Sequence, residues 1–292
     1  MKAERTIMNR RPAWINKKID FRSMHDTEER LTGLGLHTVC HQARCPNISE
    51  CYSRGTATFL MLGGACTRSC SFCNVGHGPA ASADPDEPDR IVEAVGRMGL
   101  RHAVITSVTR DDLPDGGASV FAAVTRKLKG RDPALTVELL TPDFRGDRAS
   151  IRTVVEAGPD IFGHNVETAP SLYDMRPGCD YRRSLGLLAA VKEIDPRMLT
   201  KTALLLGMGE TRDEIIEVFR DLRGAGCDFL SIGQYLRPGK GSLPVREYVA
   251  PEAFEEYGRI AAKMGFRHVE SGVYVRSSYL ADLYTGGEDA RL

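Results

Sequence analysis

The sequence predicts an α/β fold, a partial (β/α)6 barrel of parallel strands with an extension at each end. Short apolar runs alternate with longer segments of helical pattern along most of the 292 residues, as in strand–helix repeats that build a parallel sheet. The runs are apolar on both faces, as strands covered by helices are. Right-handed crossovers curl such a series, and a closed barrel has eight units, so the six units found here predict an open barrel.

Each strand is predicted where an apolar or β-branched run is bounded by polar or glycine-rich residues. The six strands are, in order, TATFLML (56–62), HAVITSVT (102–109), TVELLTP (136–142), DIFGHNVET (160–168), LTKTALLLGMGE (199–210) and DFLSIGQYLRP (228–238). The helices that follow them are predicted at 90–98, 118–128, 149–157, 184–194, 213–224 and 251–264. The signatures CTRSC, TSVTRDD, HNVET, GMGE and QYLRPG come at or after strand ends. Because loops at the carboxyl ends of parallel strands form the active site in such folds, these five loops predict one common mouth.

The predicted barrel comprises residues 56–265. Residues 1–55 precede it and carry three cysteines, and residues 266–292 follow it and carry the segment RSSY. No low-complexity linker separates the three parts. We therefore expect one domain in which both extensions lie over the mouth of the barrel.

The composition argues against several classes of function. The 39 basic and 39 acidic residues balance, so there is no overall electrostatic attraction to nucleic acid or membranes. The apolar runs are far shorter than the roughly 20 residues of a membrane span. The N-terminal segment is basic but lacks the apolar core and cleavage site of a signal peptide, so the expected location is the cytoplasm.

Six of the eight cysteines lie between Cys40 and Cys73. In a reducing cytoplasm such clustering favours metal binding or catalysis over disulfides. Cys179 and Cys227 stand alone elsewhere, and single cysteines of this kind are usually small apolar residues of the core.

The second cysteine triplet, Cys66, Cys70 and Cys73, has the spacing C-x3-C-x2-C directly after the first predicted strand. Structural zinc usually takes four ligands in two separated pairs, and His77 is the only nearby candidate for a fourth. Three thiolates suit a four-iron cluster in which one iron stays open. The alternative is a zinc knuckle.

The first triplet, Cys40, Cys45 and Cys51, has the different spacing C-x4-C-x5-C. No fourth cysteine lies near it in the sequence. His37 and His41 flank Cys40 and could be ligands, although histidines beside a metal site more often lie outside its ligand set.

The second triplet, with Phe72 just before its last cysteine, resembles the signature of the radical S-adenosylmethionine (SAM) superfamily. The resemblance implies a TIM-like partial barrel of the radical SAM type and a [4Fe-4S] cluster held by the three cysteines. It also implies that the open iron chelates the amino and carboxylate groups of SAM. One-electron reduction would then yield a 5'-deoxyadenosyl radical, with Phe72 against the adenine.

Two further segments extend this resemblance. ALLLGMGE is similar to the family's G-x-I-x-G-x-x-E segment along the adenine, in which Gly207 and Glu210 match while Ala203 replaces the first glycine. In HNVE, Asn165 and Glu167 offer polar groups for a ribose or a carboxylate. A purely structural network at the strand end is an equal alternative for HNVE.

Together, the two triplets and the C-terminal RSSY resemble the lipoyl synthases over nearly the whole chain. The likeness includes PAW, CPN, RGTATFLMLGGACTRSCSFC, ITSV.RDDL.DGGA and RSSY.ADL. The departures are mild: Tyr52 stands where an indole is common, HQA follows Cys40 where acidic residues are usual, and Thr109 replaces an aspartate. The resemblance implies that Cys40, Cys45, Cys51 and Ser278 hold an auxiliary [4Fe-4S] cluster. Without the resemblance, Ser278 would be expected only to cap a following helix.

The resemblance implies a sulfurtransferase that inserts two sulfur atoms, at C6 and C8 of a protein-bound octanoyl-lysine, with the auxiliary cluster as the sulfur donor. Those carbons have no leaving group or acidic proton, so a radical rather than an acid, base or nucleophile must start the reaction. The implied partners are an octanoylated lipoyl carrier domain (the E2 component of a 2-oxoacid dehydrogenase, or the glycine cleavage H protein) and an electron donor such as flavodoxin or ferredoxin. No nucleic-acid or membrane partner is expected. The basic residues of the first 18 could steer an acidic carrier domain, although such runs are usually solvated: Lys2, Arg5, Arg10, Arg11, Lys17 and Lys18.

Three alternatives remain open at this point. Biotin synthase and the tRNA methylthiotransferases are also sulfur-inserting radical SAM enzymes, but the latter should carry a basic, aromatic-rich RNA-binding appendage. An iron–sulfur scaffold or zinc-binding module without catalysis is the third. The barrel pattern and RSSY argue against that module.

Overall fold

The computed structural model describes residues 12–17, 33–53 and 57–284. Within them, eight strands form one sheet in the order β1-β2-β5-β6-β7-β8-β9-β10. The strands are β1 (His37–Thr38), β2 (Thr58–Met61), β5 (His102–Ser107), β6 (Thr136–Leu140), β7 (Ile161–Gly163), β8 (Leu199–Leu206), β9 (Phe229–Gln234) and β10 (His268–Gly272). From β2 to β10 every neighbouring pair is parallel, and only β1 runs antiparallel to its neighbour.

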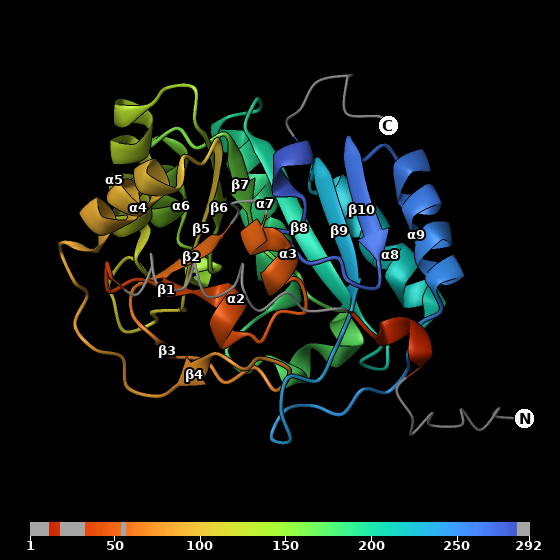
Figure 1. The fold of residues 1–292 in the computed structure, drawn as a ribbon. Coiled ribbons are helices and arrows are strands. Elements are labelled where there is room, and N and C mark those ends of the chain that lie inside the picture. Colours follow the sequence, from red (N-terminus) through yellow and green to blue (C-terminus); the bar gives the residue numbers. More distant parts are fainter. Residues whose placement is uncertain (1–11, 18–32, 54–56, 285–292) are drawn as a thin grey trace, which may run out of the picture.

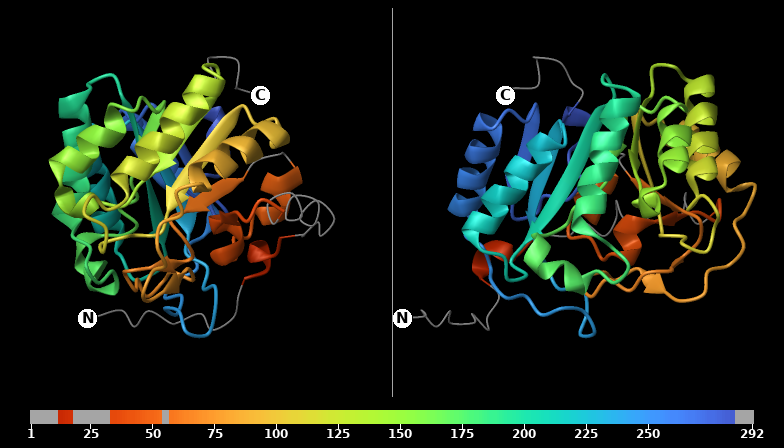
Figure 2. Two further views of the ribbon diagram at one scale, coloured as in Figure 1. Left: turned by 90° about the vertical axis from the view of Figure 1, so that its left-hand side faces the viewer. Right: turned by 180° about the vertical axis from the view of Figure 1, so that it is seen from behind.

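Helices connect these strands and cover one face of the curved sheet (Figures 1 and 2). They are α4 (Glu87–Met98), α5 (Ala118–Arg131), α6 (Arg148–Val155), α7 (Tyr181–Ile194), α8 (Arg212–Gly224) and α9 (Pro251–Lys263). Local signals in the sequence set their ends. Asp180 caps α7 by accepting from the backbone N–H of Arg183, and Thr211 with Glu214 forms a capping box at α8.

The predicted partial barrel is confirmed, because six strand–helix units follow one another and no ladder joins β1 to β10 within the described residues. The structure adds one parallel strand. β10 extends the sheet beyond α9 and lies in the segment that the sequence analysis assigned to the C-terminal extension. Its residues are all half-buried, since β10 is an edge strand, and HVESG therefore lacks the apolar run that marks the other strands.

The open face of the sheet carries short elements that the sequence did not indicate. α2 (Val39–Gln42) and α3 (Ile48–Ser53) lie on the side away from α4–α9 (Figure 1). A separate two-stranded sheet pairs β3 (Ala65–Cys66) with β4 (Gly76–His77). α2 and α3 carry Cys40 and Cys51 of the first triplet, whereas β3 carries Cys66 of the second.

A buried ion cluster lies within the sheet layer. The Nζ of Lys201 is 2.9 Å from Oε1 of Glu138 and 3.7 Å from the ring centroid of Tyr284, while His102 Nε2 is 3.2 Å from Oε2 of Glu138. Burial alone would raise the pKa of Glu138, but the charges of Lys201 and His102 outweigh it and hold that pKa below its ordinary value. The Tyr284 hydroxyl bonds to Ser231 at 2.7 Å, so the cluster ties the C-terminal segment to the sheet.

Replacing Lys201 by methionine should lower the free energy of unfolding by about 3–5 kcal/mol, because Glu138 would lose its buried ammonium partner. Urea denaturation of the protein prepared without iron–sulfur clusters measures this loss of stability. The exposed pair of Arg212 and Glu256 provides the control, and Arg212→Ala should leave the free energy of unfolding nearly unchanged. Equal losses in the two variants would contradict the importance assigned to Lys201.

Candidate functional site

The second cysteine triplet lies on a loop that starts beyond the carboxyl end of β2 and folds back on itself. Cys66 pairs with His77 across β3 and β4, and the backbone N–H of Cys73 donates to the carbonyl of Cys70 at 3.0 Å. The sulfur of Cys66 accepts a backbone N–H from Arg68, and that of Cys73 accepts one from Val75, both at 3.4 Å. Cys73 interacts electrostatically with Cys66, and Cys70 with Cys73. The three predicted thiols thus lie on one short loop, and their joint binding of a cluster stays a prediction.

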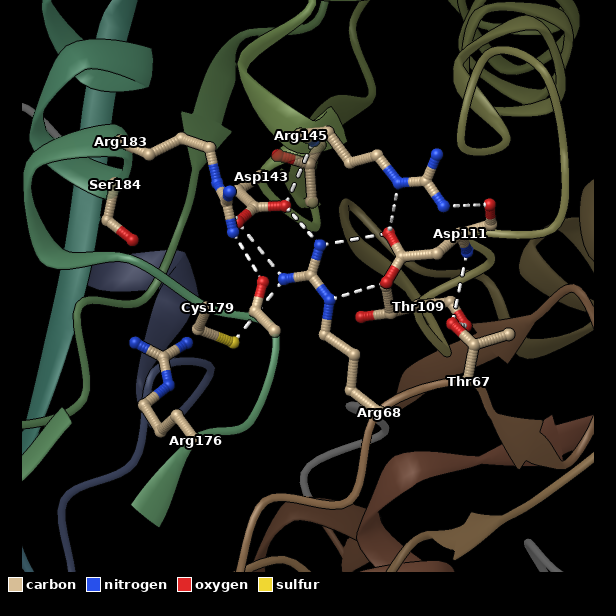
Figure 3. A network of polar contacts seen from close by, with 12 residues as sticks. Thr67, Arg68, Thr109, Asp111, Asp143, Arg145, Arg176, Cys179, Arg183 and Ser184 are labelled. Carbon is tan, nitrogen blue, oxygen red and sulfur yellow. Dashed lines mark hydrogen bonds and ion pairs between the residues drawn. The ribbon is translucent and has the colours of Figure 1, made fainter. Parts of the chain in front are cut away.

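Arg68, between the first two cysteines of this loop, anchors it to the ends of two strands (Figure 3). Its guanidinium lies 2.7 Å from Asp111, which follows β5, and 2.7 Å from Asp143, which follows β6. Arg183 contacts the same Asp143 at 2.7 Å. Burial would raise the pKa of Asp143, but the hydrogen bonds and charge of Arg68 hold it far below its ordinary value. Arg68 therefore fixes the loop through two charge-assisted contacts.

Replacing Arg68 by methionine should lower the free energy of unfolding by about 3 kcal/mol, because the buried Asp143 would lose the more deeply buried of its two cationic partners. It should also loosen the loop, so that iodoacetamide alkylates Cys70 of the cluster-free protein several-fold faster. Arg148→Met is the matched control, since Arg148 makes an exposed pair with Glu193. An unchanged alkylation rate in the Arg68 variant would show that Arg68 does not hold the loop.

Asn165 and Glu167, two predicted contacts of SAM, lie beside this triplet. Glu167 has a φ of 70°, and backbone hydrogen bonds to Ala203 and from Leu205 hold it against β8 at 2.9 and 2.8 Å. The Asn165 amide donates to Oε1 of Glu167 at 3.0 Å. Burial raises the pKa of Glu167, and the charge of Arg176 partly offsets this. Burial raises the pKa of the Cys73 thiol and the charge of Glu167 adds to this rise, so the two side chains lie in the same region.

The neighbouring His164 serves the structure instead. Its two ring nitrogens contact the carbonyl of Thr141 at 2.9 Å and the hydroxyl of Ser184 at 3.0 Å. Burial lowers the pKa of His164 to about 4, so the ring is neutral near pH 7. The structural alternative for HNVE thus applies to His164, whereas contacts of Asn165 and Glu167 with SAM stay a prediction.

Gly207 and Glu210 shape the turn after β8. Gly207 has a φ of +98°, and a Cβ atom there would lie 2.2 Å from the carbonyl oxygen of Glu247, so the position requires glycine. The carboxylate of Glu210 accepts the backbone N–H groups of Gly207 and Met208. Phe72 is half-buried on the cysteine loop. Contacts of these three residues with SAM stay a prediction.

The first triplet lies on α2, α3 and the turn between them. Cys40 is buried on α2, the backbone N–H of Cys45 donates to the carbonyl of Cys40 at 2.9 Å, and Cys51 lies on α3. Burial raises the pKa of the Cys40 thiol to about 12, with further contributions from Cys45 and Cys51. The antiparallel pairing of β1 with β2 holds this segment on the sheet. The three cysteines therefore lie on one short segment over the sheet, and their joint binding of a cluster stays a prediction.

The C-terminal RSSY segment docks on this triplet. Tyr279 donates from its hydroxyl to Glu50, next to Cys51, at 2.9 Å, and Arg276 interacts electrostatically with Cys45. Ser278 lies between these two anchors, in a turn closed by the bond from Tyr279 N to Arg276 O at 3.0 Å. The alternative that Ser278 caps a helix is wrong, because the next helix, η4 (Ala281–Leu283), follows Leu280 and has no side-chain cap.

Arg276 and Glu167 connect the two triplets. Arg276 interacts with Cys45 on one side and with Glu167 on the other, and Glu167 in turn interacts with Cys73. Glu167 and Arg276, both half-buried, thus lie in the region between the two sets of thiols. Within the described residues, no three His, Cys, Asp or Glu side chains are placed to ligate a single metal ion.

The other candidates have structural surroundings. Cys227 is fully buried and donates to the carbonyl of Phe229 at 3.4 Å, as expected of a core cysteine. His77 is exposed and His37 lies in β1. Lys17 contacts Glu50 and Asn47, each at 2.6 Å, and so belongs to the first-triplet region. The remaining basic residues of the N-terminal run lie outside the described residues.

Sequence reasoning missed Arg68 and Cys179. Arg68 could have been found, because a basic residue in CTRSC and acidic residues after two successive strands predict ion pairs at the same edge. Cys179 accepts a hydrogen bond from Arg68 at 3.3 Å and hydrogen bonds with Cys70. No sequence pattern near Cys179 predicts either contact.

Comparisons with known proteins agree with this geometry. Residues 60–222 match the model of the Radical SAM superfamily. The chain is 54% identical to a lipoyl synthase of Geobacter metallireducens over 277 residues, which is 95% of this chain and 98% of that protein. It is 53% identical to a lipoyl synthase of Rubrobacter xylanophilus, with coverage of 96% of this chain and 88% of that protein.

Solved structures support the fold alone. Methylornithine synthase superposes with a TM-score of 0.56 at 15% identity, covering 84% of this chain and 74% of its own. SuiB of Streptococcus suis bound to S-adenosylmethionine gives a TM-score of 0.55 at 12% identity, covering 74% of this chain and 50% of its own.

Among the described helices, none has the length and apolar character of a membrane span.

Proposed function

The chain belongs to the lipoyl synthases of the radical SAM superfamily, and from this premise we propose that each cysteine triplet holds one of two [4Fe-4S] clusters with separate tasks. The enzyme is a sulfurtransferase that inserts sulfur at C6 and C8 of an octanoyl-lysine. Cys66, Cys70 and Cys73 would hold the SAM-binding cluster, and Cys40, Cys45, Cys51 and Ser278 the auxiliary one. The extensions 1–55 and 266–292 then complete a reaction centre on the barrel of 56–265.

The donor chemistry of both sites fits iron–sulfur clusters. Thiolates are the ligands that such clusters take, and each triplet supplies three neighbouring ones. When bound, the SAM cluster and SAM supply the radical that abstracts hydrogen from an unactivated carbon. Asn165 and Glu167, beside Cys73, are suited to bind the polar groups of SAM. Phe72, Gly207 and Glu210 would bound the adenine.

Ser278 suits a cluster that would supply the inserted sulfur and be dismantled in doing so. A hydroxyl or alkoxide is a harder ligand than a thiolate and is mismatched with iron–sulfur chemistry, so its iron should be the easiest to lose. The docking of Tyr279 on Glu50 and of Arg276 near Cys45 supports the approach of Ser278 to the triplet.

Replacing Ser278 by alanine should leave SAM cleavage intact and reduce lipoyl formation at least tenfold, since a corner of the auxiliary cluster would lack its ligand. Iron analysis of the anaerobically reconstituted protein should show about one iron fewer per chain. Ser277→Ala is the matched control and should behave as the unaltered enzyme. Equal product formation by the two variants would remove Ser278 from the ligand set.

The Glu167–Arg276 pair supports a common reaction space. An alkyl radical must meet sulfur at once, so the two clusters have to face the same acyl chain. The pair interacts with a cysteine of each triplet, which is the single observation that carries the proposal.

The proposed macromolecular partners are an octanoylated lipoyl carrier domain and a one-electron donor such as flavodoxin or ferredoxin. The basic N-terminal run would steer an acidic carrier domain. Reversal of Lys2, Arg5, Arg10 and Arg11 to glutamate should then slow reaction with the carrier at low salt but not with a short peptide.

The proposal is tested by an anaerobic assay with an octanoyl-lysyl peptide, SAM and dithionite, read by mass spectrometry. A lipoyl-lysyl product together with 5'-deoxyadenosine is expected. About eight irons per chain would agree with two four-iron clusters. Bound zinc with no product would instead indicate a metal-binding module.

A further inference from the structure

Cys179 lies at the cluster-binding loop although neither proposed cluster uses it. It hydrogen bonds with Cys70. Its sulfur also accepts from Nη1 of Arg68 at 3.3 Å (Figure 3). The segment that carries it, between η3 (Pro170–Met175) and α7, touches the loop of the second triplet. Ser71, next to Cys70, donates its backbone N–H to the carbonyl of Met175 at 2.9 Å. A hydrogen bond therefore fastens the two backbones close to the two thiols.

The geometry singles out Cys70 as the partner of Cys179. The sulfur atoms of Cys66 and Cys73 each accept a backbone N–H from within their own loop. The thiol of Cys70 hydrogen bonds across to Cys179 instead. Cys179 is itself held in position, because its backbone N–H donates to the carbonyl of Arg176 at 2.9 Å.

Cys179 can also be reached from the surface. It lines a surface pocket of about 500 Å³ together with Tyr173, Asp180, Tyr181 and Leu185. A small disulfide molecule in this pocket would meet the sulfur of Cys179 before that of Cys70.

From these contacts we propose that Cys70 and Cys179 are a thiol redox pair, which closes to a reversible disulfide while the second triplet holds no cluster. The oxidant is a low-molecular-weight disulfide such as glutathione disulfide. The disulfide would prevent a cluster from assembling on the second triplet. Only this consequence rests on the proposed function of Cys70 as a cluster ligand.

The exchange balances without any further reactant. The Cys179 thiolate attacks one sulfur of the oxidant, forms a mixed disulfide and releases one glutathione thiolate. Cys70 then attacks the Cys179 sulfur, closes the Cys70–Cys179 bond and releases the second glutathione. The two protein thiols lose two electrons and two protons, and the oxidant becomes two glutathione thiols. A dithiol reductant reverses both steps.

The first test is a peptide map of the cluster-free full chain after incubation with glutathione disulfide. Non-reducing mass spectrometry should show one cross-link, between the peptides of Cys70 and Cys179, that disappears with dithiothreitol. Cys179→Ala should lack it, whereas Cys227→Ala, which alters a buried cysteine elsewhere, should retain it. No cross-link, or one that joins Cys70 to Cys66 or Cys73, would overturn the proposed pair.

The second test measures iron uptake after the same treatment. The oxidised chain should take up about half the iron of the reduced chain, because the first triplet stays available, and Cys179→Ala should take up the full amount. Full iron uptake by a chain that carries the cross-link would show that the disulfide does not prevent cluster assembly. If the reduced chain takes up no iron, the proposed function fails, while the cross-link still decides the redox pair.

Discussion

Replacing Cys45 by alanine should abolish lipoyl formation while SAM is still cleaved to 5'-deoxyadenosine. Cys45 is a member of the first triplet and interacts with Arg276 of the C-terminal segment, so its loss removes a ligand of the auxiliary cluster. The second triplet lies on its own loop, anchored by Arg68 to Asp111 and Asp143, and should load normally. Bound iron should therefore fall by about half.

The measurement for this variant compares 5'-deoxyadenosine and lipoyl-lysyl peptide in one anaerobic reaction. Deoxyadenosine should form at a rate similar to that of the unaltered enzyme, with the lipoyl product at background. Lipoyl formation by the Cys45 variant would contradict the proposal that the first triplet supplies sulfur while the second generates the radical.

Replacing Cys70 by alanine should abolish both products. Cys70 is the proposed middle ligand of the SAM-binding cluster, so without it we expect neither SAM cleavage nor hydrogen abstraction. The first triplet is built on α2 and α3 and contacts RSSY, so it should keep its share of about half the iron.

Cys179→Ala controls for the neighbouring thiol, which touches Cys70 but is not a proposed ligand. It should retain both SAM cleavage and lipoyl formation under reducing conditions. Retained SAM cleavage in the Cys70 variant, with Cys179 replacing the lost thiolate, would contradict the assignment of three ligands.

The strands of the barrel could be predicted from the sequence because each is a short apolar run. HAVITSVT contains β5, and LTKTALLLGMGE contains β8. β10 could not be predicted, since half-buried HVESG at the edge of the sheet has no such run. α2 and α3 span only four and six residues, too few to show helical periodicity.

The members of each triplet could be predicted from their spacing, but the relation of the triplets to each other could not. It depends on contacts between residues far apart in the chain, such as Tyr279 with Glu50, which are 229 positions apart. No local pattern encodes such a contact. Only the resemblance to a known family connected RSSY to the first triplet before the structure did.

The central claim is that the first triplet carries the sulfur that enters the product. Its most direct test is a single-turnover reaction by enzyme reconstituted with sulfur-34 sulfide, freed of excess sulfide, and supplied with octanoyl-lysyl peptide and SAM. We predict that both inserted sulfur atoms are heavy and that each chain yields at most one lipoyl group. A product of natural sulfur mass, or several products per chain without added sulfide, would contradict the claim.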